Sequence, residues 1–323
     1  MRFRLLPIAL LVTVVAAAAL PAPAGAQTKT TLTFSAGPTG GNWTPLAAAT
    51  ADVVRKRFPE VDVQVEPGTG QANMEKLLTD RTDLGWSTTT IVFDARAGKG
   101  RWKDKPADKL RYVAAYYATP WHLAVPADSD IRKIADLKGK NVAMPQRASA
   151  SMECFELLLN LSGVKLEELG AKSYGSFAQN VEMLKNRQAV AMGWLVTTPA
   201  PFMLDLGSSM KVRLIPVPDD IVEKARQANG GYVRHVLRKE TYAGLGIDAD
   251  VVTVQAPTVL MASSRVPPDT IYKLAKAIVE GREAFAHVAS VMKGIAAAEL
   301  AQNVGIPYHP GAERYYREAG LLK

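Results

Sequence analysis

Residues 34–45, FSAGPTGGNWTP, follow a short β-like run, 31–34, and lead into the alanine-rich segment 46–49. Thr44 and Pro45 are typical of a helix start, because threonine accepts hydrogen bonds from free N–H groups and proline at the first position loses none. The stretch therefore predicts a strand, a glycine loop and a helix whose N-terminus favours an anion. A tight turn without a ligand is an equal alternative. The loop is no phosphate loop, since it lacks G-K-[ST] and G-x-G-x-x-G.

The same order of signals recurs along the first half of the chain. Residues 61–65 alternate with period two, as in a half-buried strand, and continue into a glycine loop and a helix over 67–78. A third strand, 83–86, precedes the hydroxyl-rich segment 87–90. Ligands of open α/β sheets bind at the carboxyl ends of strands. We therefore expect the three loops to share one edge of a sheet.

The second half repeats this chemistry. The strand 142–144 ends in the polar loop 145–151, and a helix to about residue 161 follows. The buried strand 189–196 ends in 197–199. Arg147 at the loop tip is suited to pair with a carboxylate through its planar guanidinium, and an exposed cation is the alternative.

The first residues have the features of a secretory signal peptide. Arg2 and Arg4 precede the apolar run 5–20, and the small residues 24–26 form a cleavage site after Ala26. A membrane anchor is the alternative, which the shortness of the run disfavours. We therefore expect residues 1–26 to be removed and the mature protein to be periplasmic.

Composition and charge exclude several classes. The chain has 323 residues, of which 48% are hydrophobic, enough for one large or two ordinary domains. Removal of the two arginines of the signal takes the formal charge from +8 to +6, and the remaining basic residues are mixed with acids. This pattern disfavours nucleic-acid binding and suits a small anionic ligand. The single cysteine, Cys154, allows no intrachain disulfide and is expected to be a buried small hydrophobe.

Two loops resemble one group of receptors. Residues 37–45 match G-x-x-G-G-x-Y-Y-P, with Trp43 and Thr44 in place of the tyrosines, and residues 68–73 match the loop T-G-G-S-x-x-N, keeping its asparagine. Residues 131–142, IRKIADLKGKNV, match a segment shared by several groups of periplasmic binding proteins. The chain thus resembles the TAXI group of substrate-binding proteins, the extracytoplasmic receptors of TRAP-type secondary transporters.

The resemblance implies an α/β fold of the two-lobed, type II-like periplasmic binding proteins, with a ligand cleft between the lobes and crossing hinge strands. We expect lobe 1 over 27–121 and 262–323, and lobe 2 over 122–261. The implied function is capture of a small organic acid or amino-acid-like ligand by a monomer, without cofactor or metal, and delivery to TRAP membrane permease subunits. Relatives bind glutamate, glutamine or related dicarboxylates. Here the loop 145–151 departs from the family's glycine-rich G-x-x-x-S-G-T.

We expect backbone N–H groups and hydroxyls to hold a carboxylate, with Arg147 available for a second anionic end. The expected contacts from the first lobe are Thr39, Gly40, Gly41, Asn42, Thr69, Asn73, Ser87 and Thr88; those from the second are Arg147, Ser149, Ser151 and Thr198.

Four of the five tryptophans fall at strand ends or crossings: Trp43, Trp86, Trp121 and Trp194. For each one, packing in the core is the alternative. As a set they predict an aromatic-walled cleft, with Trp43 and Trp86 among the contacts, and a ligand with more ring character than glutamate.

Other classes of function remain open from the sequence. An enzyme is disfavoured, because the four histidines show no metal-ligand spacing and no G-x-S-x-G is present. A receptor of a tripartite tricarboxylate or ABC system would share the two-lobed shape. A receptor that presents its ligand to a sensor kinase is a further alternative.

Overall fold

The first sheet has five strands in the order β2-β1-β3-β12-β4. The strands β2 and β3 run parallel to β1, whereas β12 runs antiparallel to β3 and β4. This computed structural model describes residues 29–37, 42–104, 107–147 and 149–322. The five strands of the first sheet are β1 (Thr30–Ser35), β2 (Val61–Glu66), β3 (Leu84–Thr88), β4 (Leu110–Tyr117) and β12 (Thr258–Ser263).

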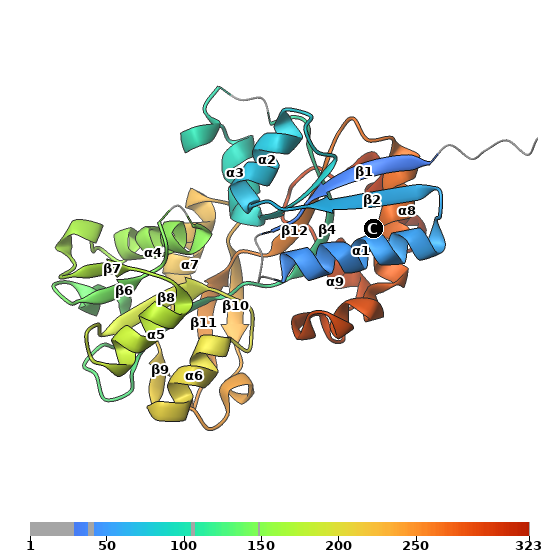
Figure 1. Cartoon of the computed structure of the whole chain (residues 1–323). Coiled ribbons are helices and arrows are strands. Elements are labelled where there is room, and N and C mark those ends of the chain that lie inside the picture. The colour runs from blue at the N-terminus through green and yellow to red at the C-terminus, as the bar shows by residue number, and fades with distance from the viewer. Residues whose placement is uncertain (1–28, 38–41, 105–106, 148, 323) are drawn as a thin grey trace, which may run out of the picture.

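The second sheet also has five strands, in the order β7-β6-β8-β5-β9. They are β5 (Trp121–Pro126), β6 (Val142–Met144), β7 (Lys172–Tyr174), β8 (Ala191–Leu195) and β9 (Val212–Leu214). An antiparallel ribbon of β10 (Val233–Leu237) and β11 (Val251–Gln255) lies beside it. Figure 1 shows the two sheets on opposite sides of the segments that connect them.

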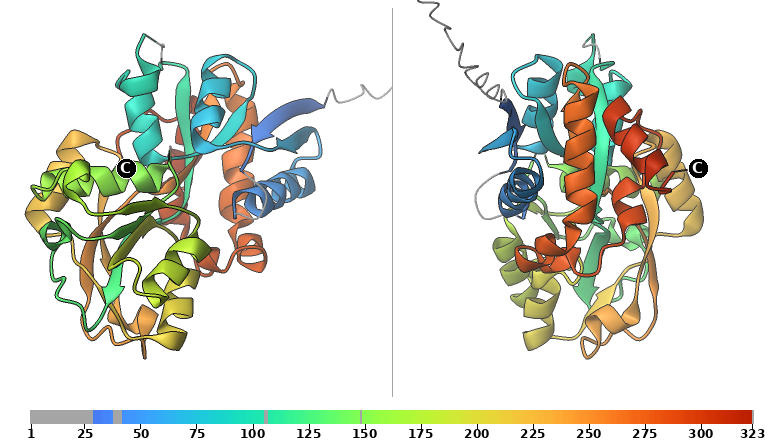
Figure 2. Two further views of the ribbon diagram at one scale, coloured as in Figure 1. Left: turned by 60° about the vertical axis from the view of Figure 1, so that its left-hand side comes forward. Right: turned by 90° about the vertical axis from the view of Figure 1, so that its right-hand side faces the viewer.

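Helices cover both faces of each sheet, which gives two three-layered α/β units. In the first unit one core packs under α1, α8 and α10 and the other under α2 and α3. In the second, α4 and α7 cover one face and α5 and α6 the other (Figure 2). The helices are α1 (Trp43–Arg57), α2 (Gly70–Leu78), α3 (Thr89–Arg96), α4 (Ala150–Leu161), α5 (Phe177–Lys185), α6 (Pro201–Ser209), α7 (Asp219–Ala228), α8 (Pro268–Glu280), α9 (Ala297–Ala301) and α10 (Pro310–Glu318).

The predicted order of strand, small polar loop and helix is confirmed. Thr69 caps α2 by accepting from the N–H of Ala72, and Ser149 caps α4 by accepting from the N–H of Met152. The predicted start of the first helix, with Thr44 as cap and Pro45 as first helical residue, is wrong by two residues. The helix α1 already begins at Trp43, because the Thr44 hydroxyl donates to the Gly37 carbonyl, 3.1 Å away, instead of capping the helix.

The chain crosses between the two sheets twice. It leaves the first sheet after β4 and enters the second at β5, and it returns between β11 and β12. The two crossings lie together, since Pro120 bridges to Gln255 and the Thr119 hydroxyl donates to the Ala256 carbonyl. The whole of β12 pairs in the first sheet, so residues 258–261 lie with β3 and β4 and not in the second sheet.

Among the described residues no helix has the length and apolar character that a membrane span requires. Cys154 is fully buried in the core beneath α4, and burial raises the pKa of its thiol above the usual range. The predicted signal peptide, 1–26, lies outside the described residues.

Candidate functional site

A cavity of about 570 Å³ lies between the two α/β units, on the side where β1, β2 and β3 end. The first unit contributes the end of β3, the starts of α1 and α2 and the crossing segments. The second contributes the loop before α4, the start of α5 and the end of β8. The residues that line the cavity are Asn42, Trp43, Thr69, Gly70, Gln71, Thr88, Ile91, Tyr117, Thr119, Thr258, Gln146, Ser149, Ala150, Ser151, Phe177, Leu195, Val196 and Thr197.

Five helices begin at this cavity, namely α1, α2 and α3 from the first unit and α4 and α5 from the second. The first N–H groups of a helix have no carbonyl partner within the helix. In α2 and α4 the cap oxygens hold the third N–H, at 3.3 and 3.1 Å, which leaves the first two N–H groups of each helix at the cavity. These N–H groups and the positive ends of the helix dipoles favour an anion between the two units.

The described lining residues include no Asp, Glu, Lys, Arg or His. The neighbouring stretches that the structure does not describe, 38–41 and 148, contain only Pro, Thr, Gly and Ala. Any attraction for an anion at the described surface of the cavity therefore comes from amides, hydroxyls and helix ends.

An aromatic group forms one wall of the cavity. The indole N–H of Trp43 lies 3.4 Å from the Thr258 hydroxyl, and Tyr117 lines the same wall. Burial raises the pKa of Tyr117 to about 12, so its hydroxyl stays neutral over the physiological range. A neutral hydroxyl can donate a hydrogen bond to an anion.

Phe177 belongs to the opposite wall and was not among the predicted contacts. It is the first residue of α5, its side chain is 40% exposed, and its ring stacks on Phe202 and packs 4.0 Å from the Trp194 ring, centroid to centroid. The sequence signal that pointed to the other loops was present here too, because Ser176 caps α5 immediately after β7.

The structure brings six of the predicted contacts together at the cavity. They come from both units, as the cleft hypothesis requires, and their role in binding stays a prediction. The six are Asn42, Trp43, Thr69, Thr88, Ser149 and Ser151. Three further predicted contacts, Thr39, Gly40 and Gly41, lie outside the described residues.

Three predicted contacts lie behind the cavity wall instead of on it. Asn73, Trp86 and Ser87 are fully buried, so we assign them to the support of the loops. The Ser87 hydroxyl donates to the Gly70 carbonyl, and the Trp86 indole N–H donates to the Trp43 carbonyl. Strand-end position alone does not decide whether a side chain points into the core or into the cleft, because successive side chains of a strand point to opposite faces.

Two predicted contacts from the second unit lie elsewhere. The guanidinium of Arg147 stacks on the Tyr174 ring, 3.7 Å from its centroid, and does not line the cavity. Thr198 lines a separate cavity of about 420 Å³ beside the crossing strands, together with His235 and Gln255. Of the other tryptophans, Trp121 is buried against Phe155 and Trp194 lies behind Phe177, so Trp43 alone of the predicted aromatic wall lines the cavity.

Asn73 joins the ends of two strands. Its side-chain N–H group donates to the carbonyls of Ala36, at 2.8 Å, and Trp86, at 2.9 Å. Replacing Asn73 by alanine leaves both buried carbonyls without this donor, so we expect the free energy of unfolding to fall by about 2–4 kcal/mol. Urea denaturation measures the change. Asn160→Ala, at an exposed position of α4, is the matched control, and an equal effect of both substitutions would contradict this role.

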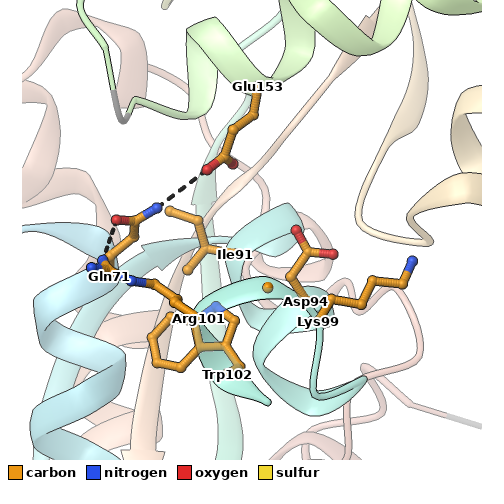
Figure 3. A pocket seen from close by; sticks show the side chains of 8 residues that line it. Gln71, Ile91, Asp94, Lys99, Arg101, Trp102 and Glu153 are labelled. Atoms are coloured by element: carbon orange, nitrogen blue, oxygen red, sulfur yellow. Dashed lines mark hydrogen bonds between the residues drawn. The ribbon is translucent and has the colours of Figure 1, made fainter.

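A second cavity of about 430 Å³ adjoins the first, with Gln71 and Ile91 in both walls. Figure 3 shows Gln71 between two charged groups: it accepts from Arg101 and donates to Glu153, 3.2 Å away on α4. This bond joins the two α/β units. Burial raises the pKa of Glu153, and the nearby carboxylate of Asp94 raises it further.

The comparison with known sequences decides the family. Residues 34–320 match the sequence profile of the NMT1-like family. The chain belongs to the NMT1-like family. The matched region of this NMT1-like chain covers both sheets, apart from the first four residues of β1, and every helix that begins at the central cavity. This match does not show whether the chain belongs to the TAXI group that the two loops suggest.

Solved structures give the fold. A TctC solute-binding protein from Polaromonas shares 14% identity with this NMT1-like chain, over 90% of it and 98% of the other, with a TM-score of 0.52. A protein described as the periplasmic sulfonate-binding protein SsuA of Methylobacillus flagellatus shares 13%, over 92% of this chain and 89% of the other, also with a TM-score of 0.52. The predicted fold class, two-lobed α/β periplasmic binding protein, is confirmed.

Proposed function

We propose that the protein is a solute-binding receptor that captures a small carboxylate-bearing ligand between its two α/β units. The observation that carries this proposal is the central cavity, at which helices from both units begin. A ligand that contacts both walls stabilises the closed arrangement over the open one by its differential affinity for the two. The family and the fold of the structural neighbours support the same function.

The two units are the proposed lobes, and the crossing segments are the proposed hinge. Pairing of β12 in the first sheet favours crossings at 118–120 and 256–257, a few residues before the boundaries at 121/122 and 261/262 expected from the sequence. Both crossings lie next to the cavity, because Tyr117, Thr119 and Thr258 line it. Small changes in backbone angle there would move one wall relative to the other.

We further propose that the receptor is exported to the periplasm and serves a TRAP-type permease. The loops at 37–45 and 68–73 support the TAXI assignment over the tripartite tricarboxylate and ABC alternatives. An adjacent gene for a large TRAP permease would support this assignment, and an adjacent ABC ATPase gene would overturn it. A catalytic role is disfavoured, since the described lining offers no carboxylate, imidazole or thiol for acid–base or nucleophilic chemistry.

Filling the cavity tests the receptor function. Ala150 lines the cavity at the first position of α4, so Ala150→Trp places a bulky ring where the ligand would lie. We expect affinity for the bound carboxylate, measured by isothermal titration calorimetry, to fall at least about tenfold. Ala48→Trp, at an exposed position of α1 away from the cavity, is the matched control and should bind normally. Unchanged binding by the Ala150 variant would overturn the proposed site.

A further inference from the structure

We propose that the solute is a monoanion with an aromatic or branched apolar body, and not a dicarboxylate or an amino acid such as glutamate. The anionic group lies at the helix N-termini and the apolar body lies between Trp43 and Tyr117 on one wall and Phe177 on the other. This inference rests on the proposed receptor function and names its ligand class.

The charge of the ligand follows from the uncharged lining. One carboxylate can be satisfied by the free N–H groups of α2 and α4 and by the helix dipoles. A second carboxylate in the same cavity would be buried without a countercharge, because no Lys, Arg or His is among the described lining residues. Burial of an unpaired charge costs several kcal/mol or more. The undescribed stretches 38–41 and 148 contain no basic residue that could change this balance.

The basic residues of the adjoining cavity are already engaged. Arg101 bonds to Gln71 and lies 3.8 Å from Glu75, and the Lys99 ammonium donates to the Ala228 carbonyl at 2.6 Å. The same cavity also contains the carboxylates of Asp94 and Glu153 (Figure 3). If a second carboxylate of a ligand reached this cavity, it would therefore lie near the carboxylates of Asp94 and Glu153, and the two basic side chains there already have partners within the protein.

Most hydroxyls of the central cavity already make at least one hydrogen bond within the protein. Six of the lining hydroxyl groups already have a partner within the protein: Thr69 with the Ala72 amide, Thr88 with Thr90, Thr119 with Ala256, Ser149 with Gln146 and Met152, Ser151 with Leu195, and Thr258 with Trp43. A ligand with many polar groups would lose its hydration here without gaining matching bonds.

Apolar side chains supply the rest of the wall. Ile91 and Tyr117 belong to the first unit, and Phe177, Leu195 and Val196 to the second. Phe177 is held in place by Trp194 and Phe202 yet stays 40% exposed. A rigid aromatic side chain exposed into a cavity provides a large contact area with little loss of entropy on binding. This wall suits a flat or branched apolar body.

Matched pairs of probes separate charge from shape in calorimetric titrations of the full-length mature protein. Phenylacetate is compared with phenylmalonate, which keeps the same ring and adds a second carboxylate on the α-carbon. The branched monoanion 4-methyl-2-oxopentanoate is compared with 2-oxoglutarate. Glutamate and benzenesulfonate complete the set. We expect at least one of the two monocarboxylates to bind, and its dianionic counterpart to bind at least about a hundredfold more weakly.

A variant tests the aromatic wall. Phe177→Ala should weaken the best monocarboxylate at least about tenfold, whereas Leu204→Ala, a 50% exposed apolar residue of α6 outside the cavity, should leave it unchanged. Equal or tighter binding of phenylmalonate, 2-oxoglutarate or glutamate overturns this inference and leaves the receptor function standing. Preference for benzenesulfonate over phenylacetate leaves the inferred monoanion with an apolar body standing, and contradicts a carboxylate as the anionic group in the proposed function. Binding of no probe overturns both.

Discussion

Replacing Gly231 by valine is expected to weaken ligand binding by about a hundredfold while leaving the ligand-free protein folded. A Cβ atom at this glycine would lie 2.5 Å from the backbone of Thr89 and Thr90 in α3. Because these neighbours are backbone atoms, they cannot move aside as a flexible side chain would. The added atoms must therefore separate the segment before β10 from the first unit.

Among the described residues, this segment makes most of the polar contacts between the two units outside the crossings. The Thr89 hydroxyl donates to the Gly231 carbonyl at 2.6 Å. The Asn229 amide group donates to the Thr90 carbonyl at 3.0 Å and to the Asp94 carboxylate at 2.9 Å. In the proposed account these contacts help to hold the two walls of the cavity together, so their loss favours the open state at the expense of binding.

Calorimetry with the best-binding monoanion and thermal unfolding without ligand measure the two parts of this expectation. Gln227→Val, at an exposed position on the neighbouring helix α7, is the control for added bulk. Gly231→Ala should shift affinity in the same direction by a smaller factor. Wild-type affinity in the valine variant would show that this contact has no part in closure.

The second large effect is a loss of stability on acidification. His122 is fully buried at the start of β5, and burial lowers its pKa from 6.5 to about 4. The Pro120 carbonyl can only accept, so Nδ1 of His122 carries the ring proton, and in the neutral ring Nε2 accepts from the Tyr242 hydroxyl, 2.6 Å away, whose oxygen in turn accepts from the Ala200 amide. The ring is therefore neutral with its proton on Nδ1, which donates to the Pro120 carbonyl at 2.9 Å.

The sign of the pH effect follows from the lowered pKa. Between pH 6.5 and about 4 the unfolded chain binds a proton at His122 that the folded protein excludes. The stabilisation is complete above pH 6.5 and is lost as the pH falls toward 4. At about pH 5 the loss amounts to about 2 kcal/mol for this histidine. His309, whose pKa burial also lowers to about 4, adds to it in the same direction.

Urea denaturation of the wild type and of His122→Gln at neutral and acidic pH measures this effect. The variant is expected to be less stable at neutral pH, but its stability should fall by about 2 kcal/mol less between neutral pH and about pH 5. Contributions of surface carboxylates cancel in this comparison, because they are common to both proteins. Parallel pH profiles would contradict a neutral, buried His122.

Much of the fold followed from local signals in the sequence. Period-two alternation located β2, a continuous apolar run located β8, and small polar residues marked the ends of both. Cap residues fixed the starts of α2 and α4, because Thr69 and Ser149 satisfy amides that no helical carbonyl can reach. These interactions join residues close together in sequence, so one sequence suffices to predict them.

Local signals in the sequence did not predict whether an individual side chain points into the core or into the cavity. Trp86 and Trp43 both lie near strand or loop ends, yet Trp86 packs against Phe34 and Tyr116 in the core while Trp43 lines the cavity. Which face of a strand is buried depends on the helices that cover it. Of the predicted tryptophans only Trp43 lines the cavity, and the aromatic lining residues Tyr117 and Phe177 were not among the predicted contacts.

Contacts between distant segments left no signal at all. Arg147 had a plausible partner in a ligand carboxylate, but Tyr174, on the neighbouring strand β7, takes the guanidinium instead. The bond between Gln71 and Glu153, and that between Asn229 and Asp94, join residues far apart in the chain through the packing of the two units. Only the three-dimensional arrangement shows which charged residues are available to a ligand.

Native mass spectrometry of the mature protein, purified without added ligand from cells grown in rich medium, tests the central claim most directly. The claim predicts an additional mass corresponding to one small singly charged organic acid per chain, present in the wild type and Ala48→Trp and absent from Ala150→Trp. A bound molecule retained equally by Ala150→Trp, in which the cavity between the two units is filled, would contradict it.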